Sequence, residues 1–251
     1  MTGPPVRSES PASGRSAAAV ISGARRLKRR ARGVAGRVRH RYGWETSRLA
    51  GALSQVSAGT VALTFDDGPR PGATERVLDL LADLDVQASF FCVGKNAVAH
   101  PDLLRRISLA GHAIGSHSFT HPHPQQTPLR ILARDYADGR AAVEDVLGRS
   151  VSLFRPPHGH LNPLSALLIR RLRLCPWLWS VDPTDWRPGI TTAEVTQVAS
   201  QADSADVVLF HDWVEQPLAP EALDRSATVD SLPAVISDVR RRGLRLVTVS
   251  S

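Results

Sequence analysis

The sequence has few of the residues that stabilise disulfide-rich secreted proteins. It holds two cysteines, Cys92 and Cys175, among 251 residues. Two cysteines exclude a framework of several disulfides, because at most one bridge can form. Two unpaired, buried thiols are the simpler expectation.

Long hydrophobic runs are also absent. The longest uncharged run ahead of the main body, Leu49 to Phe65, contains five Ser, Thr or Gln residues and is too polar for a transmembrane helix. The apolar run Ala17 to Ile21 is shorter than the stretch of about 7–15 apolar residues that a secretory signal needs. We therefore expect a cytoplasmic protein, free or associated with the cytoplasmic membrane, and leave secretion open.

Lysine is scarce, and the positive charge that is present is unevenly distributed. Residues 1–48 hold twelve Lys and Arg against two Asp and Glu, a net charge of +10, whereas residues 49–251 carry a net charge of −3. The basicity therefore belongs to one end of the chain, which argues against nucleic-acid binding by the whole protein. We expect residues 1–57 to form a basic, flexible tail that is either solvated or adheres to an anionic membrane or polymer surface. Residues 58–251 form the expected folded domain.

Beyond residue 58, short apolar runs alternate with helical patterns. The expected strands are 61–65, 88–93, 112–116, 151–154, 174–181, 207–210 and 246–249. The expected helices are 74–84, 101–110, 128–147, 163–171, 192–202 and 231–242. This alternation predicts an α/β fold with a mainly parallel sheet. About seven strands suit a closed or nearly closed (β/α) barrel, and a doubly wound open sheet is the alternative.

Ionisable residues gather directly after successive strands. They are Asp66 and Asp67, His117 and His121, Arg155 and His158, Asp182 and Asp185, and His211 and Asp212. In α/β barrels the loops at the carboxyl ends of the strands build the active site. Five loops are therefore expected to bring these groups to one mouth.

Two of these groups suggest a metal site. His117 and His121 stand four residues apart, and on a helical turn this spacing presents two imidazoles to one metal ion. Asp66 and Asp67 repel each other when buried, and a divalent cation relieves that repulsion. One of the two carboxylates can then bind metal while the other remains free as a base.

Five motifs follow one another in the chain. They are TFDDG (64–68), HSFTH (117–121), RPPHG (155–159), DPTDW (182–186) and VLFHD (208–212). In these motifs, residues 58–251 resemble the polysaccharide deacetylase family, also called the NodB-homology domain or carbohydrate esterase family 4. The resemblance implies a distorted (β/α) barrel with about seven parallel strands. It also implies a metal-dependent hydrolase that removes N-acetyl groups from amino sugars of a glycan or glycan intermediate.

The resemblance also implies residue roles. Asp67, His117 and His121 correspond to the ligands of one divalent metal ion, Zn²⁺ or another ion such as Co²⁺. Asp66 corresponds to the general base, which Arg155 orients. His211 corresponds to the general acid, which Asp185 keeps protonated.

On the substrate side, the resemblance assigns Trp186 and Leu209 to a pocket for the acetyl methyl group. The backbone N–H of His158 is the expected donor to the oxyanion. The family most often has Tyr where this chain has His158, which puts the usual substrate in question. Two other functions remain open at this point. One is a related metal hydrolase acting on another amide, an imide or an acetyl ester such as acetylxylan, and the other is an inactive glycan-binding domain.

Overall fold

The computed structural model describes residues 3, 47–49 and 51–251. Most of the tail expected over residues 1–57 therefore lies outside the described residues, and its flexibility stays a prediction. Within the described chain, no helix combines the length and the apolar character that crossing a membrane requires.

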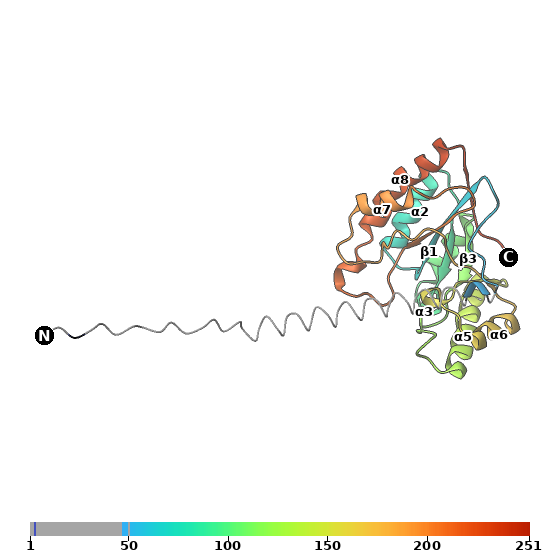
Figure 1. Ribbon diagram of the computed structural model, residues 1–251. Helices are drawn as coiled ribbons and strands as arrows, with labels where there is room; N and C mark the ends of the chain where they lie inside the picture. The colour runs from blue at the N-terminus through green and yellow to red at the C-terminus, as the bar shows by residue number, and fades with distance from the viewer. Residues whose placement is uncertain (1–2, 4–46, 50) are drawn as a thin grey trace. The chain divides into compact units, whose positions relative to one another are not determined.

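Parallel strands form the centre of the domain (Figure 1). Among the described residues there are seven: β1 (Thr60–Asp66), β2 (Ser89–Cys92), β3 (Ala113–Ser116), β4 (Leu153–Phe154), β5 (Cys175–Pro176), β6 (Val207–His211) and β7 (Arg245–Val247). Neighbours follow the order β5-β4-β3-β2-β1-β6, and β7 pairs with the first residues of β1. Since every ladder is parallel, the loops that follow the strands meet at one edge.

The two ends of this strand order are connected by residues 175–181. β5 pairs with β4, and Val181 then forms a parallel bridge with Val208 of β6. The sheet is therefore a half-barrel with these residues across its open side, and the expected distorted barrel is confirmed. The single strand expected over 174–181 is wrong, because only Cys175–Pro176 pairs with β4. Pro176 has no N–H for a ladder, and the backbone N–H of Leu178 turns instead to the carbonyl of Leu53.

Alternation along the strands separates a helix-facing core from the barrel interior. Phe65 stacks on Phe90 and Phe210, at ring-centroid distances of 5.1 and 5.6 Å, in the core beneath the helices. Their sequence neighbours Phe91 and Leu209 belong to the second core cluster, with Trp177 and Trp179. Pairing places Asp66 opposite His211, so these two residues end adjacent strands at the same level.

Helices cover the outside of the half-barrel in two groups (Figure 1). α2 (Ala73–Asp83), α7 (Thr192–Ala199) and α8 (Ser226–Arg241) pack together. α3 (Gly94–Ala99), α4 (Pro101–Leu109), α5 (Leu129–Leu147) and α6 (Pro163–Arg171) form the other group. Two short 3-10 helices, η1 (Pro157–Gly159) and η2 (Pro220–Leu223), lie in loops.

Several helix boundaries follow from local chemistry. The side chain of Asn162 caps α6 by accepting the backbone N–H of Ser165 at 2.8 Å, as the Asn-Pro pair indicates. Gly148 ends α5 in the left-handed conformation at φ 65°, where glycine is favoured. α8 begins at Ser226, earlier than the expected residue 231, and contains Pro233.

The packed unit includes described residues that precede the expected boundary at residue 58. The hydroxyl of Ser47 donates to the carbonyl of Gly159 at 2.9 Å and accepts the backbone N–H of Leu161 at 2.6 Å. Leu53 forms a parallel bridge with Trp177. Ser47 and residues 51–57 therefore belong structurally with the domain that follows them.

Candidate active site

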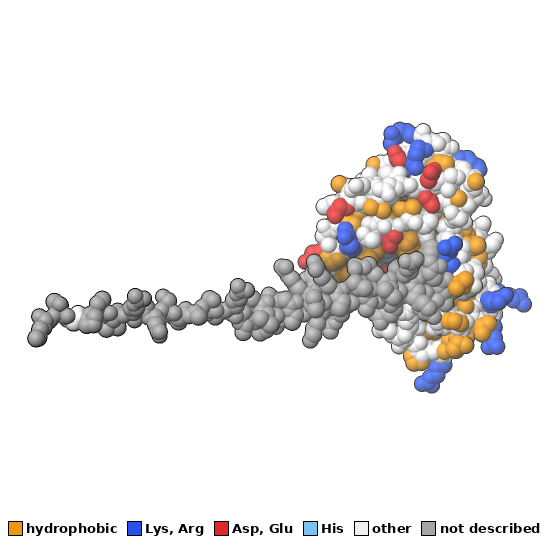
Figure 2. All heavy atoms as spheres, in the orientation of Figure 1, with side chains coloured by type: hydrophobic (Ala, Val, Ile, Leu, Met, Phe, Trp, Pro, Cys, Tyr) orange, Lys and Arg blue, Asp and Glu red, His pale blue; other side chains and the backbone are white. Residues whose placement is uncertain are grey.

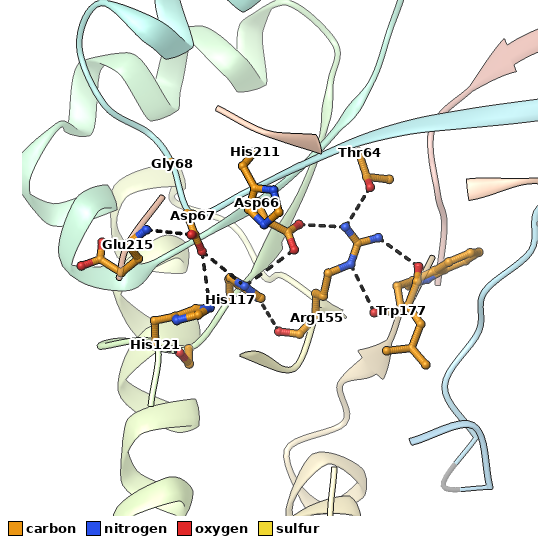
Figure 3. Close-up of polar contacts among 12 residues, drawn as sticks. Thr64, Asp66, Asp67, Gly68, His117, His121, Arg155, Trp177, His211 and Glu215 are labelled. Atoms are coloured by element: carbon orange, nitrogen blue, oxygen red, sulfur yellow. Dashed lines mark hydrogen bonds and ion pairs between the residues drawn. The ribbon is translucent and has the colours of Figure 1, made fainter. Parts of the chain in front are cut away.

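The structure gathers the ionisable residues that follow the strands at one edge of the half-barrel, as the sequence predicts. Asp66 ends β1, Asp67 follows it, and His211 ends β6. His117 directly follows β3 and Arg155 directly follows β4. Figure 3 shows these side chains converging on one another.

Arg155 holds Asp66 from inside the barrel. Its side chain is fully buried, and Nη1 donates to Oδ1 of Asp66 and to Oγ1 of Thr64, each at 2.8 Å. Its other nitrogens donate to the carbonyls of Trp177 and Leu178 at 3.3 and 3.0 Å. Burial raises the pKa of Asp66, while Arg155 and then His211 oppose that rise by attraction.

Asp67, His117 and His121 form a buried cluster that can hold a metal ion. One ligand atom from each residue lies within 4.8 Å of the other two. Nε2 of His117 and Nε2 of His121 each lie 3.5 Å from Oδ1 of Asp67. Oδ1 is buried and has no hydrogen-bond partner within the described structure. A divalent cation fits this carboxylate oxygen and the two imidazole nitrogens.

His117 is arranged to offer a neutral nitrogen. Its Nδ1 lies 2.7 Å from the carbonyl of Arg155, to which it donates, so Nε2 keeps its lone pair for the cluster. Burial, together with the neighbouring His121, holds the pKa of His117 well below its usual value. Metal binding requires neutral imidazole, so burial favours the ligating form.

Residues 117–121 do not form the helical turn on which a spacing of four would present two imidazoles to one metal ion. Ser118 and His121 have φ values of 69° and 58°, and the segment is a loop. Asp135 of α5 holds this loop by accepting the backbone N–H of Phe119 at 2.9 Å and the hydroxyl of Thr120 at 2.6 Å. A Cβ on Gly139 would lie 2.2 Å from the backbone of Ser118, so glycine is required there.

His211 and Asp185 form a second ion pair. Nδ1 of His211 lies 2.7 Å from Oδ1 of Asp185, and the backbone N–H of His211 donates to Oδ2 at 2.9 Å. The hydroxyl of Thr228 also donates to Oδ2, at 2.7 Å, and Nη1 of Arg225 lies 3.6 Å from it. Burial disfavours the charged imidazole, but attraction to Asp185 raises the pKa of His211 to about 9. His211 is therefore protonated at neutral pH.

The expected substrate residues lie beside this site. His158 is half-buried, and its backbone has a φ of 59°. The centroid of its ring lies 4.7 Å from the centroid of the His121 ring. Leu209 is 2 % exposed and packs in the second core cluster. Trp186 is half-buried in the turn directly after Asp185.

Sequence reasoning missed several residues that contact the site. Glu215 and Gln216 contact the metal cluster, while Arg225 and Thr228 contact Asp185. None of them stands in a motif, and no spacing indicates them. Asp212 does stand in a motif; it accepts the backbone N–H of Gly68 at 3.2 Å and the hydroxyl of Thr74 at 2.5 Å, and burial raises its pKa to about 7.

Comparison with known proteins shows the family to which this chain belongs. The family model described as polysaccharide deacetylase matches residues 54–175. A peptidoglycan-N-acetylglucosamine deacetylase of Bacillus cereus is 35 % identical over 193 residues, covering 76 % of this chain and 86 % of the relative. A chitooligosaccharide deacetylase of Azorhizobium caulinodans is 30 % identical over 191 residues, covering 74 % and 91 %.

A solved structure shows the same architecture. It is a peptidoglycan N-acetylglucosamine deacetylase in complex with 4-naphthalen-1-yl-N-oxidanyl-benzamide. It superposes with a TM-score of 0.71 at 29 % identity, over 79 % of this chain and 90 % of that one. This chain is a member of the polysaccharide deacetylase family.

Proposed function

We propose that this protein is a metal-dependent hydrolase that removes N-acetyl groups from amino sugars of a glycan or glycan intermediate. One observation carries the proposal. Asp66, held by Arg155, and His211, held by Asp185, end adjacent paired strands beside a cluster that can bind a cation. A base, an acid and a Lewis-acid site at one edge are the groups that amide hydrolysis needs.

The proposed metal is Zn²⁺, held by Asp67, His117 and His121, and Co²⁺ is an alternative. One carboxylate and two imidazoles leave an open position, as catalytic zinc sites do. When bound, the ion polarises the acetamide carbonyl and lowers the pKa of a water molecule.

Asp66 is the proposed general base. Its Oδ1 is held by Arg155, while Oδ2 lies 3.7 Å from Nε2 of His117, beside the cluster. Oδ2 is therefore oriented to take the proton of the attacking water. Burial raises the pKa of this carboxylate above its usual value and Arg155 opposes that rise, so Asp66 is more basic than an exposed aspartate.

His211 is the proposed general acid. Breaking the C–N bond expels an amine, which leaves only after it is protonated. The attraction of Asp185 keeps the imidazolium available for that transfer. We further propose that the backbone N–H of His158 donates to the oxyanion, and that Trp186 and Leu209 contact the acetyl methyl group.

The function is tested by acetate release from a panel of N- and O-acetylated glycans, with metal analysis of the same sample. We expect release from N-acetylated oligomers such as chitooligosaccharides, supported by Zn²⁺ or Co²⁺ and lost on chelation. Release from acetylxylan alone would instead assign an esterase. Binding of N-acetylated oligomers without any release would leave a glycan-binding domain.

We also propose that the basic segment adheres to an anionic membrane or polymer surface, because residues 1–48 carry a net charge of +10. Deleting residues 1–46 is expected to weaken sedimentation with anionic vesicles. Turnover of soluble substrate should change by less than about twofold, because Ser47 and the residues after it remain.

Deleting residues 1–57 also removes the backbone hydrogen bonds of Leu53 and should therefore lower Tm. Unchanged sedimentation after the shorter deletion would contradict this proposal.

A further inference from the structure

The segment that follows His211 contacts both loops that carry the metal cluster. The backbone N–H of Glu215 donates to Oδ2 of Asp67 at 2.8 Å, and Nε2 of Gln216 donates to the carbonyl of His121 at 2.8 Å. Asp67 follows β1, whereas His121 follows β3, which lies beyond β2 in the sheet. One segment after β6 therefore joins two loops that the sheet keeps apart.

The contact with Glu215 makes the two oxygens of Asp67 different. Oδ2 is occupied by the backbone N–H, while Oδ1 faces Nε2 of His117 and Nε2 of His121 (Figure 3). A hydrogen bond to an ionised carboxylate is short and directional. It therefore fixes which oxygen is turned toward the cation.

The side chain of Glu215 is itself fixed. It is 8 % exposed and pairs with Nζ of Lys95, and its Oε2 accepts Nδ2 of Asn96 at 2.8 Å. Nδ2 of Asn96 also donates to the carbonyl of Asp67 at 2.8 Å. A buried carboxylate without partners would be costly, so these contacts determine where the backbone of Glu215 lies.

Lys95 and Asn96 belong to α3, which also holds the loop of His121. The backbone N–H of Gly94 donates to the carbonyl of Ser118 at 2.8 Å, and that of Lys95 donates to the carbonyl of Phe119 at 3.2 Å. The contacts thus form a closed ring that runs from Asp67 through Glu215, α3 and the 117–121 loop to His121. Gln216 completes the ring by returning from His121 to the segment after β6.

We propose that Glu215 and Gln216 are positioning residues that set the affinity of the Asp67–His117–His121 cluster for its cation. The proposal rests on the proposed function in that the cluster binds a divalent ion. Outer contacts that orient ligands typically contribute 10–100-fold to metal affinity. Neither side chain touches the reacting atoms, so the effect falls on binding of the ion and not on the chemical step.

The test measures the Zn²⁺ affinity of the full-length protein by competition with a chelator of known affinity. We expect Gln216→Ala and Glu215→Ala to weaken Zn²⁺ binding about 10–100-fold, with one ion per chain at saturation. At saturating Zn²⁺, kcat for acetate release should stay within a few-fold of the wild type. Glu215→Gln keeps an acceptor for Asn96 but loses the charge that pairs with Lys95, so its effect should be intermediate.

Glu221→Ala and Gln201→Ala are matched controls, because both side chains are exposed and neither contacts the cluster. They should keep wild-type affinity. Gln216 is also exposed, so Gln216→Ala should keep the fold intact. Its Zn²⁺ affinity therefore tests the proposal even if Glu215→Ala unfolds. Wild-type Zn²⁺ affinity in folded Gln216→Ala would overturn the proposal for Gln216, and wild-type affinity in folded Glu215→Gln would overturn it for Glu215. The two proposals can also fail separately. If the wild type binds Zn²⁺ tightly but releases no acetate, the proposed function is wrong. If Gln216→Ala still weakens that Zn²⁺ binding, this inference holds.

Discussion

Asp66→Asn is expected to lower kcat for acetate release by about 10²–10⁴-fold while the protein keeps its metal ion. Asparagine has the shape of aspartate and keeps an oxygen for Nη1 of Arg155, which donates to Asp66 at 2.8 Å in the wild type. It cannot accept the proton of the attacking water. The measurement is kcat at saturating Zn²⁺, with metal content determined on the same sample.

Stability has to be followed in the same experiment. Removing the carboxylate leaves the fully buried Arg155 without its counter-charge, so Tm should fall as well. The rate comparison is therefore made well below the Tm of the variant. Asp79→Asn, an exposed carboxylate on α2, is the control and should leave kcat unchanged. A kcat above one tenth of the wild type would remove Asp66 from the role of base, and loss of the metal would place it among the ligands.

The position of the site could be predicted from sequence because it depends on simple geometry. Parallel strands joined by helices end at one edge, so any polar residue at the end of a strand or directly after it lies at that edge. Asp66, His117, Arg155 and His211 all follow this rule. Asp66 lies opposite His211 because of the register between β1 and β6, and this register cannot be read from the spacing of residues along the chain.

The conformation of the 117–121 loop could not be predicted, because residues far along the chain determine it. A spacing of four suggests a helical turn, but Asp135 binds the backbone of Phe119 and the side chain of Thr120. Gly139 then allows α5 to approach the loop closely. Within the loop, the backbone N–H of His121, whose φ is 58°, donates to Oγ of Ser118 at 3.0 Å.

Residues that act through the backbone leave no sequence signal either. Glu215 reaches Asp67 through its backbone N–H, which every residue except proline possesses. Its side chain is important because of Lys95 and Asn96, which lie far from it in the sequence. Such contacts become visible only in the folded structure, and Figure 3 shows the one between the backbone N–H of Glu215 and Asp67.

The charges at the site are arranged differently from those on the surface. Carboxylates gather at the strand ends, where Arg155 and His211 balance two of them. On the surface seen in Figure 2, acidic and basic side chains intermingle over the helices around α8, while basic and hydrophobic ones gather near α5 and α6. The basic composition of the whole sequence thus says little about the site, whose electrostatics come from a few buried pairs.

The pairing of His211 with Asp185 predicts a particular pH dependence. The pKa of His211 is raised from 6.5 to about 9, so the alkaline limb of kcat/KM in the wild type should lie near pH 9. The raised pKa of His211 also makes the free energy of unfolding depend on pH. Because this pKa is higher in the folded than in the unfolded protein, the His211–Asp185 pair stabilises the fold fully below about pH 6.5. This contribution is lost as pH rises through about 9.

Asp185→Asn should move the alkaline limb down from pH 9 toward about 6.5, because Asp185 has the largest of the effects that raise the pKa of His211 against burial. With a pKa of 6.5, the protonated fraction of His211 would be about 30-fold lower than in the wild type at pH 8 but less than about twofold lower at pH 6, so acidification should partly restore kcat/KM. Thr228→Val is the control, because it removes one hydrogen bond from Asp185 but leaves the charge of Asp185 in place. The alkaline limb of this variant should stay near that of the wild type.

An unchanged alkaline limb in Asp185→Asn would show that another group limits the reaction at high pH. A purely structural role for Asp185 would instead lower kcat/KM equally at pH 6 and pH 8.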